Sequence, residues 1–323
     1  MGANVLISSL HYVQQNAHLY PLIEETVLLK LPNESFEEFP LVSPFKETEY
    51  NPIADLKETI SLLAPNMSST VKETLKERVK AFNLLQNSGK SSFHPTKSRL
   101  RSLQRHILLQ AYTRVIVRPN LLNKYKRFSN QVYGEATPEF ASLMFSHCGL
   151  STRCSFVDLG SGIGTVVLQA AIECGCDSFG IELMSLPSAY AKALQVETEL
   201  RLKCYNLKYG KIRLKQGDFL NDAETFSRLE AATHIFTNNL VFGPKVNQSL
   251  LDLFICLPDG AKVCSLEPFD YNFSLSRETV HYPQAIFRTE KVEYPANSMS
   301  WTPSAGHFYI HTVDRKRICK YIE

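Results

Sequence analysis

The fold of this chain is decided by one stretch of its sequence, Phe156-Val157-Asp158-Leu159-Gly160-Ser161-Gly162-Ile163-Gly164-Thr165. Its first residues are apolar and predict a buried strand over 155–159, and a helical pattern follows over 166–173. Three alternating glycines join the two, and glycine can adopt the backbone angles of a tight turn and let a ligand approach the bare main chain. The stretch therefore predicts a nucleotide-like ligand at the end of a strand.

Acidic residues near three strand ends indicate which ligand this is. Glu182 ends the next predicted strand, where its carboxylate can accept both hydroxyls of a ribose. Asp218 and Phe219 follow the third strand, where they can hold an adenine by its amino group and by stacking. Asp158 precedes the glycines, where it would repel a phosphate but attract the sulfonium and ammonium charges of S-adenosylmethionine. We therefore expect S-adenosylmethionine; the alternative is a nicotinamide or flavin cofactor, whose turn is spaced Gly-x-Gly-x-x-Gly.

From residue 151 onward, predicted strands and helices alternate. A long helix is expected over 187–205, and further strands over 178–182, 211–216, 234–237, 261–266, 286–293 and 307–313. This rhythm predicts right-handed crossovers and an α/β fold. Together with the expected cofactor it indicates the Rossmann-like sheet of class I S-adenosylmethionine-dependent methyltransferases, with seven mostly parallel strands. We expect this catalytic domain over 126–323.

The region 1–125 is expected to be an α-rich N-terminal extension, with short strands followed by basic helices. Six prolines between residues 21 and 65 argue against long helices there, and 27–31 is predicted to be a strand. One helix is expected to begin at Ser69-Thr70 and to end at Asn87-Ser88-Gly89. A second follows Pro95, with a buried face formed by Leu100, Leu103, Ile107 and Ala111.

The net charge of +3 conceals a strongly basic segment. Residues 72–130 contain fourteen Lys and Arg against two Asp and Glu, whereas 1–71 contain three against nine and 131–323 eighteen against twenty-one. Such a block indicates a polyanionic partner. The expected contacts are Lys97, Arg99, Arg101, Arg105, Lys124, Lys126 and Arg127. The alternative is that several of these side chains only solvate helix surfaces.

Other functional classes find no support in the sequence. No apolar run of about eighteen residues and no secretory signal pattern occurs, so we expect no membrane association. All eight cysteines lie from Cys148 onward, mostly in apolar segments and without zinc-type spacing. We therefore expect reduced thiols and no metal site. Cys174 and Cys176 are the closest pair along the chain.

Four separated segments, in order, resemble the disruptor of telomeric silencing family, the non-SET histone lysine methyltransferases. They are Val132-Tyr133-Gly134-Glu135-Ala136-Thr137, the glycine stretch, Thr237-Asn238-Asn239-Leu240-Val241-Phe242-Gly243-Pro244, and Ser298-Met299-Ser300-Trp301-Thr302. The resemblance covers roughly residues 120–315. It implies methylation of a lysine on the histone-fold surface of histone H3 in nucleosomes, and roles in chromatin and telomeric silencing. It also implies a nuclear monomer that contacts histone H4 and DNA, with ubiquitin on histone H2B as a further candidate partner.

The resemblance also implies a role for individual residues. Tyr133, Gly134, Glu135 and Ala136 would wrap the methionine end of the cofactor, Phe156 to Thr165 would form its cradle, Glu182 would hold the ribose, and Asp218 and Phe219 the adenine. Leu240, Phe242, Ser300 and Trp301 would wall the lysine channel, with Asn238 beside the transferred methyl. The implied catalytic residues are Asn238, Tyr133, Trp301 and Phe242. Two features depart from the family: its Asn-Asn-Phe reads Asn238-Asn239-Leu240, and a late aromatic pair reads Phe308-Tyr309, without one expected phenolic hydroxyl.

Two other functions are weighed against this one. Segment 238–242 lies where nucleic-acid amino methyltransferases carry an acid or Asn, two prolines and an aromatic residue that grip a flipped base. The prolines are absent here. A non-enzymatic chromatin-binding module would need a broken cofactor site, and every polar cofactor contact named above is intact in the sequence.

Overall fold

The computed structural model describes residues 6–7, 26–40, 51–64, 67, 75–87, 96–116, 122, 136–270, 273–300 and 302–322. The chain folds as two compact units, the first formed by Met1–Val117 with Val196–Lys208 and the second by Arg118–Gln195 with Tyr209–Glu323. The long helix α8 (Ser185–Cys204) is therefore divided between the units. Nothing in the sequence pattern indicated that its last residues group with the N-terminal unit.

Among the described residues, the first unit combines a small sheet with three helices of its own and the last residues of α8. The sheet has the order β1-β3-β2, with β1 (Leu6–Ile7), β3 (Phe36–Pro40) and β2 (Thr26–Lys30), and β2 lies antiparallel to β3. The helices are α2 (Pro52–Leu63), α3 (Leu75–Asn87) and α4 (Lys97–Val115). The predicted strand over 27–31 corresponds to β2, and the helix expected after Pro95 corresponds to α4. The helix start expected at Ser69-Thr70 lies outside the described residues, while α3 ends at Asn87 as expected.

Helix α2 corrects the expectation that prolines keep this region free of long helices. Its first residue is Pro52, where the missing N–H would have no partner within the helix in any case. The Asn51 side chain accepts hydrogen bonds from the amides of Ile53 and Ala54, both at 3.1 Å. The Asn51-Pro52 pair is therefore a helix start, and the even spacing of the prolines does not exclude a long helix in this region.

A buried network of charged side chains forms the centre of the first unit. Arg201 of α8 donates from Nη2 to Glu37 of β3 at 3.0 Å and from Nε to Glu197 at 2.9 Å. Arg114 of α4 donates to the same Glu37 oxygen at 2.6 Å and to Asp55 of α2 at 3.0 Å. Burial alone would raise the pKa of Asp55, but the His106 hydrogen bond and the Arg114 charge hold it far below its usual range. One strand and three helices are thus tied together by charge.

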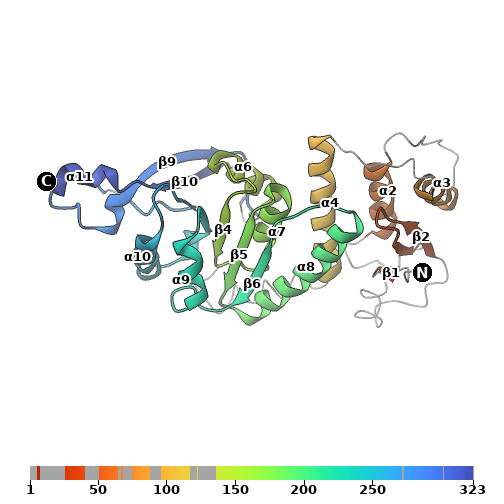
Figure 1. Ribbon diagram of the computed structural model, residues 1–323, viewed down its shortest axis with the longest axis horizontal. Coiled ribbons are helices and arrows are strands. Elements are labelled where there is room, and N and C mark those ends of the chain that lie inside the picture. Colours follow the sequence, from red (N-terminus) through yellow and green to blue (C-terminus); the bar gives the residue numbers. More distant parts are fainter. Residues whose placement is uncertain are drawn as a thin grey trace. The chain divides into compact units, whose positions relative to one another are not determined.

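The second unit contains a seven-stranded sheet of the predicted type (Figure 1). Its order is β6-β5-β4-β7-β8-β10-β9, with β4 (Ser155–Leu159), β5 (Asp177–Glu182), β6 (Ile212–Gln216), β7 (His234–Thr237), β8 (Lys262–Ser265), β9 (Phe287–Tyr294) and β10 (Gly306–Val313). The first five are parallel, and β10 is antiparallel to both of its neighbours. The class I methyltransferase sheet expected from the sequence is confirmed, with strand bounds within about one residue of those predicted.

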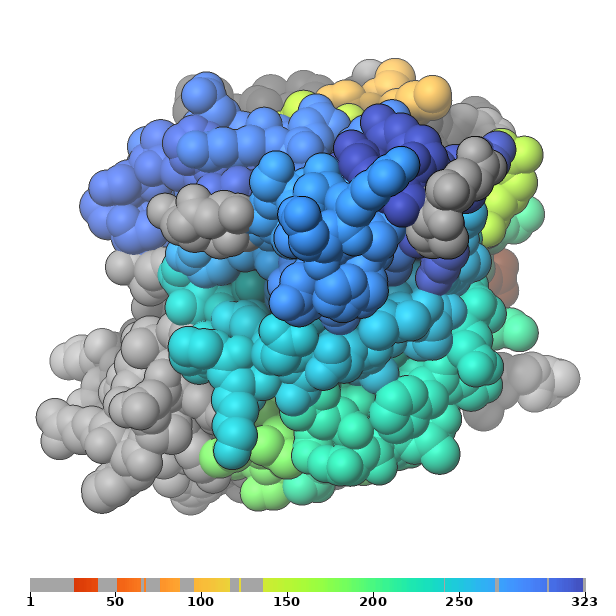
Figure 2. All heavy atoms as spheres, turned by 90° about the vertical axis from the view of Figure 1, so that its left-hand side faces the viewer, coloured from red at the N-terminus to blue at the C-terminus, as the bar shows by residue number. Residues whose placement is uncertain are grey.

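Helices cover this sheet. They include α6 (Pro138–Cys148), α7 (Thr165–Gln169), α9 (Ala223–Glu230) and α10 (Pro244–Leu253). The last helix, α11 (Lys316–Ile322), contacts the short turn Pro283–Ile286 instead. Figure 2 views the unit from the side of α9, α10 and the C-terminal segments. The helix expected over 166–173 widens after Gln169 into a π-helical turn, Ala170–Cys174, before Gly175 ends it in the left-handed region. No helix in the described part of the chain combines the length and apolarity that crossing a membrane requires.

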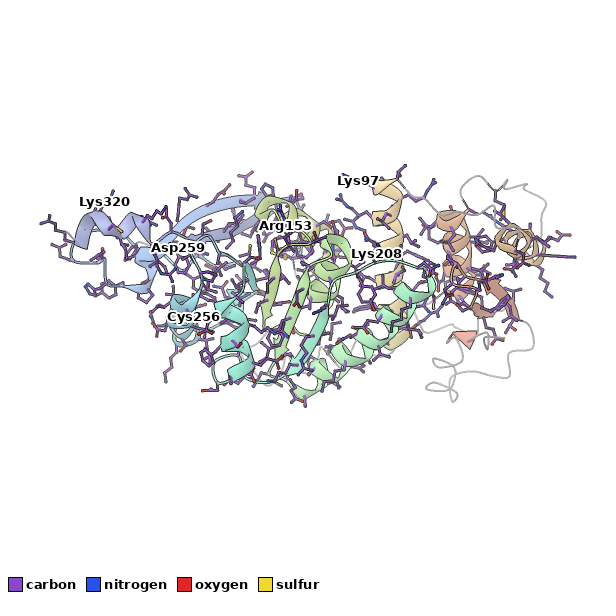
Figure 3. The ribbon with its side chains drawn as sticks, viewed as in Figure 1. Lys97, Arg153, Lys208, Cys256, Asp259 and Lys320 are labelled. Carbon is purple, nitrogen blue, oxygen red and sulfur yellow. The ribbon has the colours of Figure 1, made fainter. Side chains whose placement is uncertain are left out.

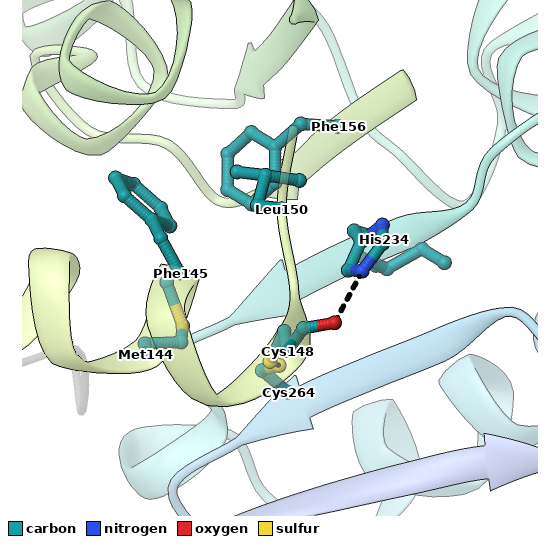
Figure 4. Close-up of a pocket in the computed structure, with 8 residues that line it drawn as sticks. Met144, Phe145, Cys148, Leu150, Phe156, His234 and Cys264 are labelled. Atoms are coloured by element: carbon teal, nitrogen blue, oxygen red, sulfur yellow. Dashed lines mark hydrogen bonds between the residues drawn. The ribbon is translucent and has the colours of Figure 1, made fainter. Parts of the chain in front are cut away.

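A small apolar cavity lies beside the last turn of α6 (Figure 4). Its wall includes Phe156 and His234, which lie near the amino ends of β4 and β7, so the cavity is remote from the strand ends where a ligand is expected. There the Sγ atoms of Cys148 and Cys264 are 2.9 Å apart. The thiols that meet are thus far apart in sequence, unlike Cys174 and Cys176. None of the eight cysteines, all of which are described, forms a disulfide.

Candidate active site

The strand order places the candidate site between β4 and β7. From β4 the chain continues to β5 and β6 on one side of the sheet, and then returns to β7 and β8 on the other. The loops after β4 and β7 therefore diverge, and open α/β sheets bind their ligands in the crevice at the carboxyl ends of such strands. The two loops are the glycine turn over 160–164 and the segment 238–243, so the fold brings two of the sequence-predicted segments to one edge. Thr237 ties these ends together, because its hydroxyl donates to the carbonyl of Leu159 at 3.2 Å.

The glycine turn has the backbone conformation that its sequence requires. Gly160, Gly162 and Gly164 have φ of 85°, 56° and 81°, a region that side chains disfavour. A Cβ at Gly164 would also lie 2.8 Å from Leu214 of β6. The amides of Gly160 and Ser161 both donate to the carbonyl of Ile181 at 3.0 Å, so the turn is fixed to the end of β5.

Most of the other residues of the predicted cradle are buried next to the turn. Phe156, Val157, Leu159 and Ile163 are all at most 2% exposed, and Thr165 begins α7. Because these apolar side chains are packed in the core, only their backbone is available to a ligand. The polar groups of the cradle are therefore the loop amides, the hydroxyls of Ser161 and Thr165 and the acids beside them.

Asp158, which is buried, and Glu182, which is partly buried, form a pair of acids at this edge. The carboxylate of Glu182 accepts from the amide of Gly162 at 2.9 Å and from that of Met184 at 2.8 Å. Burial raises the pKa of Glu182 although these amides act in the opposite direction. Asp158 is 2% exposed, and its burial, followed by the charge of Glu182, raises its pKa to about 8. Two carboxyl groups that burial disfavours as anions suit a ligand that carries positive charge.

The segment expected to hold an adenine follows β6, the strand next to β5. Asp218 accepts from the amide of Leu220 at 3.0 Å and from Nδ2 of Asn221 at 2.6 Å. The ring of Phe219 lies 5.9 Å from that of Phe242, centroid to centroid. A Cβ at Gly160 would lie 3.4 Å from Cζ of Phe242. Phe242 therefore lies against the glycine turn and Phe219.

A short antiparallel contact joins two further predicted segments. Ala136 pairs with Met299, and the amide and hydroxyl of Thr137 both donate to the carbonyl of Ser298, at 3.1 and 2.9 Å. Thr137 also caps α6, because its hydroxyl accepts from the amide of Phe140 at 3.3 Å. Residues 136–137 and 298–299 therefore lie side by side. Ser300 is exposed, and the predicted site residues Tyr133, Gly134, Glu135 and Trp301 lie outside the described residues.

Segment 238–243 contains one residue that the sequence reasoning did not select. Asn238, the predicted catalytic residue, is partly buried at the end of β7, and Leu240 is 42% exposed. Asn239 is 1% exposed, and its side chain has four hydrogen-bond partners. No local signal in the sequence distinguishes it from Asn238, since its partners are distant along the chain. Within the described ranges, no three His, Cys, Asp or Glu side chains are grouped so that they could hold a metal ion.

Comparisons with known proteins point to one family. A family model described as histone methylation protein DOT1 matches residues 112–313. A histone-lysine N-methyltransferase, H3 lysine-79 specific, of Yarrowia lipolytica is 37% identical over 67% of this chain and 44% of the relative. A protein of the same name from Aspergillus fumigatus is 30% identical over 90% of this chain and 65% of the relative. Another, from Drosophila melanogaster, is 34% identical over 69% of this chain and 12% of the relative. The chain thus spans less than two thirds of the length of these curated relatives.

Proposed function

Because the chain belongs to the family of the histone methylation protein DOT1, we propose that it transfers methyl groups from S-adenosylmethionine to a lysine on the histone-fold surface of histone H3 in nucleosomes. The observation that carries the proposal is the meeting of the glycine turn with segment 238–243 at the crevice between β4 and β7. Both segments lie within the matched residues 112–313. The relatives named above are specific for lysine 79 of histone H3.

The residues of the crevice fit this cofactor better than a dinucleotide. Burial disfavours the anionic forms of Asp158 and Glu182. A cationic ligand would stabilise these anions, whereas a phosphate would not. In the proposed arrangement Glu182 holds the ribose, Asp218 and Phe219 hold the adenine, and residues 133–136 wrap the methionine end. S-adenosylmethionine supplies a methyl group that its positively charged sulfur has already activated. The protein therefore contributes mainly positioning.

The chain must also accept the substrate lysine as a neutral amine. A lysine in water has a pKa of about 10.4. An apolar channel formed by side chains such as Leu240 and Phe242 would lower that pKa by removing water, and a neighbouring positive charge would lower it further. The amine can then lose its proton to solvent as it enters the channel. We therefore propose that no dedicated general base is needed, and that Asn238 orients the reacting groups beside the methyl.

The test of this function is mass spectrometry of nucleosomes after incubation with the protein and S-adenosylmethionine. We expect added methyl groups on one lysine of histone H3, and we expect Asn238→Ala to reduce turnover roughly 100-fold through weaker positioning while cofactor affinity is retained. Naked nucleic acid and free histones are the controls. Methylation of nucleic acid would favour the base methyltransferase instead, and full turnover by Asn238→Ala would contradict the role given to Asn238.

We further propose that the basic segment over 72–130 contacts nucleosomal DNA. Helix α4 supplies the described part of this surface. Lys97 and Arg101 are exposed and Arg99 and Arg105 partly exposed, while Leu103, Ile107 and Ala111 form the buried face. Figure 3 shows Lys97 at the first turn of α4. Lys124, Lys126 and Arg127 lie outside the described residues and remain predicted contacts. Contacts with histone H4, a response to ubiquitin on histone H2B, a monomeric state and nuclear location are part of the same proposal.

Charge reversal on α4 tests the DNA contact. Removing one Lys or Arg that binds a phosphate should weaken binding of bare DNA and reduce the slope of log affinity against log salt by about 1. We therefore expect the double variant Arg101→Glu, Arg105→Glu to show a visibly flatter salt dependence in a fluorescence titration. The matched control is Arg153→Glu, an exposed arginine outside the basic segment. Salt-independent binding, or equal effects of both variants, would show that α4 is merely a solvated helix.

A further inference from the structure

The amide side chain of Asn239 joins three segments at the candidate site. Its Oδ1 accepts from the amides of Leu266 and Glu267, at 3.1 and 2.8 Å. Its Nδ2 donates to the carbonyl of Glu267 at 3.1 Å and to Oδ1 of Asn247 at 3.2 Å. Both lone pairs and both N–H groups are therefore used, and the two backbone amides fix which end of the side chain is the oxygen. Asn239 thus links the loop after β7, the loop after β8 and helix α10.

Asn239 is also connected, by the chain and by hydrogen bonds, to the residues expected to face the substrate. Asn239 follows Asn238 in the chain, and its carbonyl accepts from the amide of Phe242 at 3.1 Å. Asn247 in turn donates to the carbonyl of Phe242 at 3.1 Å. The short turn that contains Leu240 is therefore fixed at both ends, although Leu240 itself is 42% exposed.

We propose that Asn239 is a positioning residue for methyl transfer, which holds Asn238 and Phe242 in place by fastening their loop to residues 266–267. The inference rests on the function proposed above and adds a residue whose side chain hydrogen-bonds only to groups outside the cofactor segments and the proposed lysine channel. The physical reason is burial: a side chain that is 1% exposed cannot exchange its partners for water, so the two loops can separate only by breaking several hydrogen bonds together. The glycine turn does not depend on this amide, since it is fastened to Ile181 and Glu182.

The test separates turnover from cofactor binding. We expect Asn239→Ser in the full chain to lower kcat on nucleosomes roughly 100-fold, because a small displacement of the reacting groups can reduce the rate by this amount. The dissociation constant of S-adenosylmethionine should change less than about threefold, because the polar groups proposed to bind it lie on other segments. Hydrogen exchange should accelerate at the amides of Leu266, Glu267 and Phe242, and stay unchanged over 160–164. Unchanged kcat, or equal losses of kcat and cofactor affinity, would overturn the positioning role.

Ser265→Ala is the matched control. The Ser265 hydroxyl is also buried and donates to the carbonyl of Glu267 at 2.8 Å, but its other partner is His311 of β10, at 2.9 Å, and not segment 238–243. The variant should leave kcat near the wild-type value, and an equally large fall would show that any disturbance of residues 266–267 is enough.

A second variant covers the case in which Asn239→Ser does not fold. Asn247→Ala leaves the two backbone amides bound to Asn239, so it should give a smaller loss of kcat and the same exchange pattern at Phe242. A wild-type protein that is inactive on nucleosomes contradicts the proposed function instead, and the exchange comparison then still decides whether Asn239 fastens the loops.

Discussion

Replacing Asp158 by asparagine is expected to make the cofactor-free protein more stable at about pH 8 and, at the same time, a much poorer binder of S-adenosylmethionine. Asp158 is 2% exposed and its pKa is raised to about 8, from 3.8. A carboxyl group with a raised pKa in the folded state adds no penalty below the unfolded value, and it reduces stability progressively as pH rises towards the folded value. A tenfold change in proton affinity corresponds to about 1.4 kcal/mol, so the penalty at about pH 8 is at most on the order of 5 kcal/mol.

Asparagine has the same shape and no charge, so it removes this penalty. Denaturant unfolding of the apo protein should therefore give equal stabilities for wild type and Asp158→Asn near pH 4, and a growing advantage of the variant up to about pH 8. The affinity for S-adenosylmethionine should fall, because loss of a buried charge opposite a cation costs about 2 kcal/mol or more of binding free energy. This corresponds to a roughly 30-fold loss of affinity. Asp177→Asn, an acid at the start of β5 whose side chain is 43% exposed, is the control and should change neither quantity. Unaltered cofactor affinity in Asp158→Asn would contradict the role of Asp158.

Replacing Arg201 by alanine is expected to destabilise the first unit by about 3–5 kcal/mol, the usual consequence of removing one partner from a buried ion pair. Arg201 is 1% exposed and donates to Glu37, Glu197 and Gln110 at 2.8–3.0 Å. Without it, two carboxylates stay buried with less compensating charge. Arg201→Lys should recover little, since an ammonium group cannot reproduce three directed contacts of a planar guanidinium.

Hydrogen exchange measured separately over α2, α4 and the end of α8 is the appropriate readout, because two units need not unfold together. Arg213→Ala provides the comparison. Arg213 pairs with Glu224 at 3.3 Å, but its side chain is 54% exposed, so its loss should cost less than about 1 kcal/mol. Equal effects of the two substitutions would mean that the buried network contributes no more than a surface ion pair.

The same network also decides how the chain divides. A boundary near residue 125 followed naturally from composition, because the acidic and basic segments precede the alternating strands and helices. Residues 196–208 nevertheless group with the N-terminal unit, since Arg201 and Glu37 meet across 164 positions of sequence. We therefore expect that residues 1–125 produced alone would lack Arg201, one of the two arginines that pair with Glu37, and would keep only Arg114. Composition indicates local structural preferences, but it does not predict which charged residues, distant in sequence, form ion pairs in the folded chain.

Local sequence patterns were enough to predict the sheet, the glycine turn and the kind of ligand. Those inferences rest on short-range rules: strands and helices repeat with periods of 2 and 3.6, and only glycine readily adopts the φ of 85° found at Gly160. The backbone partners of the Asn239 side chain, which are 27 and 28 positions away, and the approach of Phe242 to Gly160 became visible only in three dimensions. A buried amide must be satisfied, but tertiary packing chooses the groups that satisfy it.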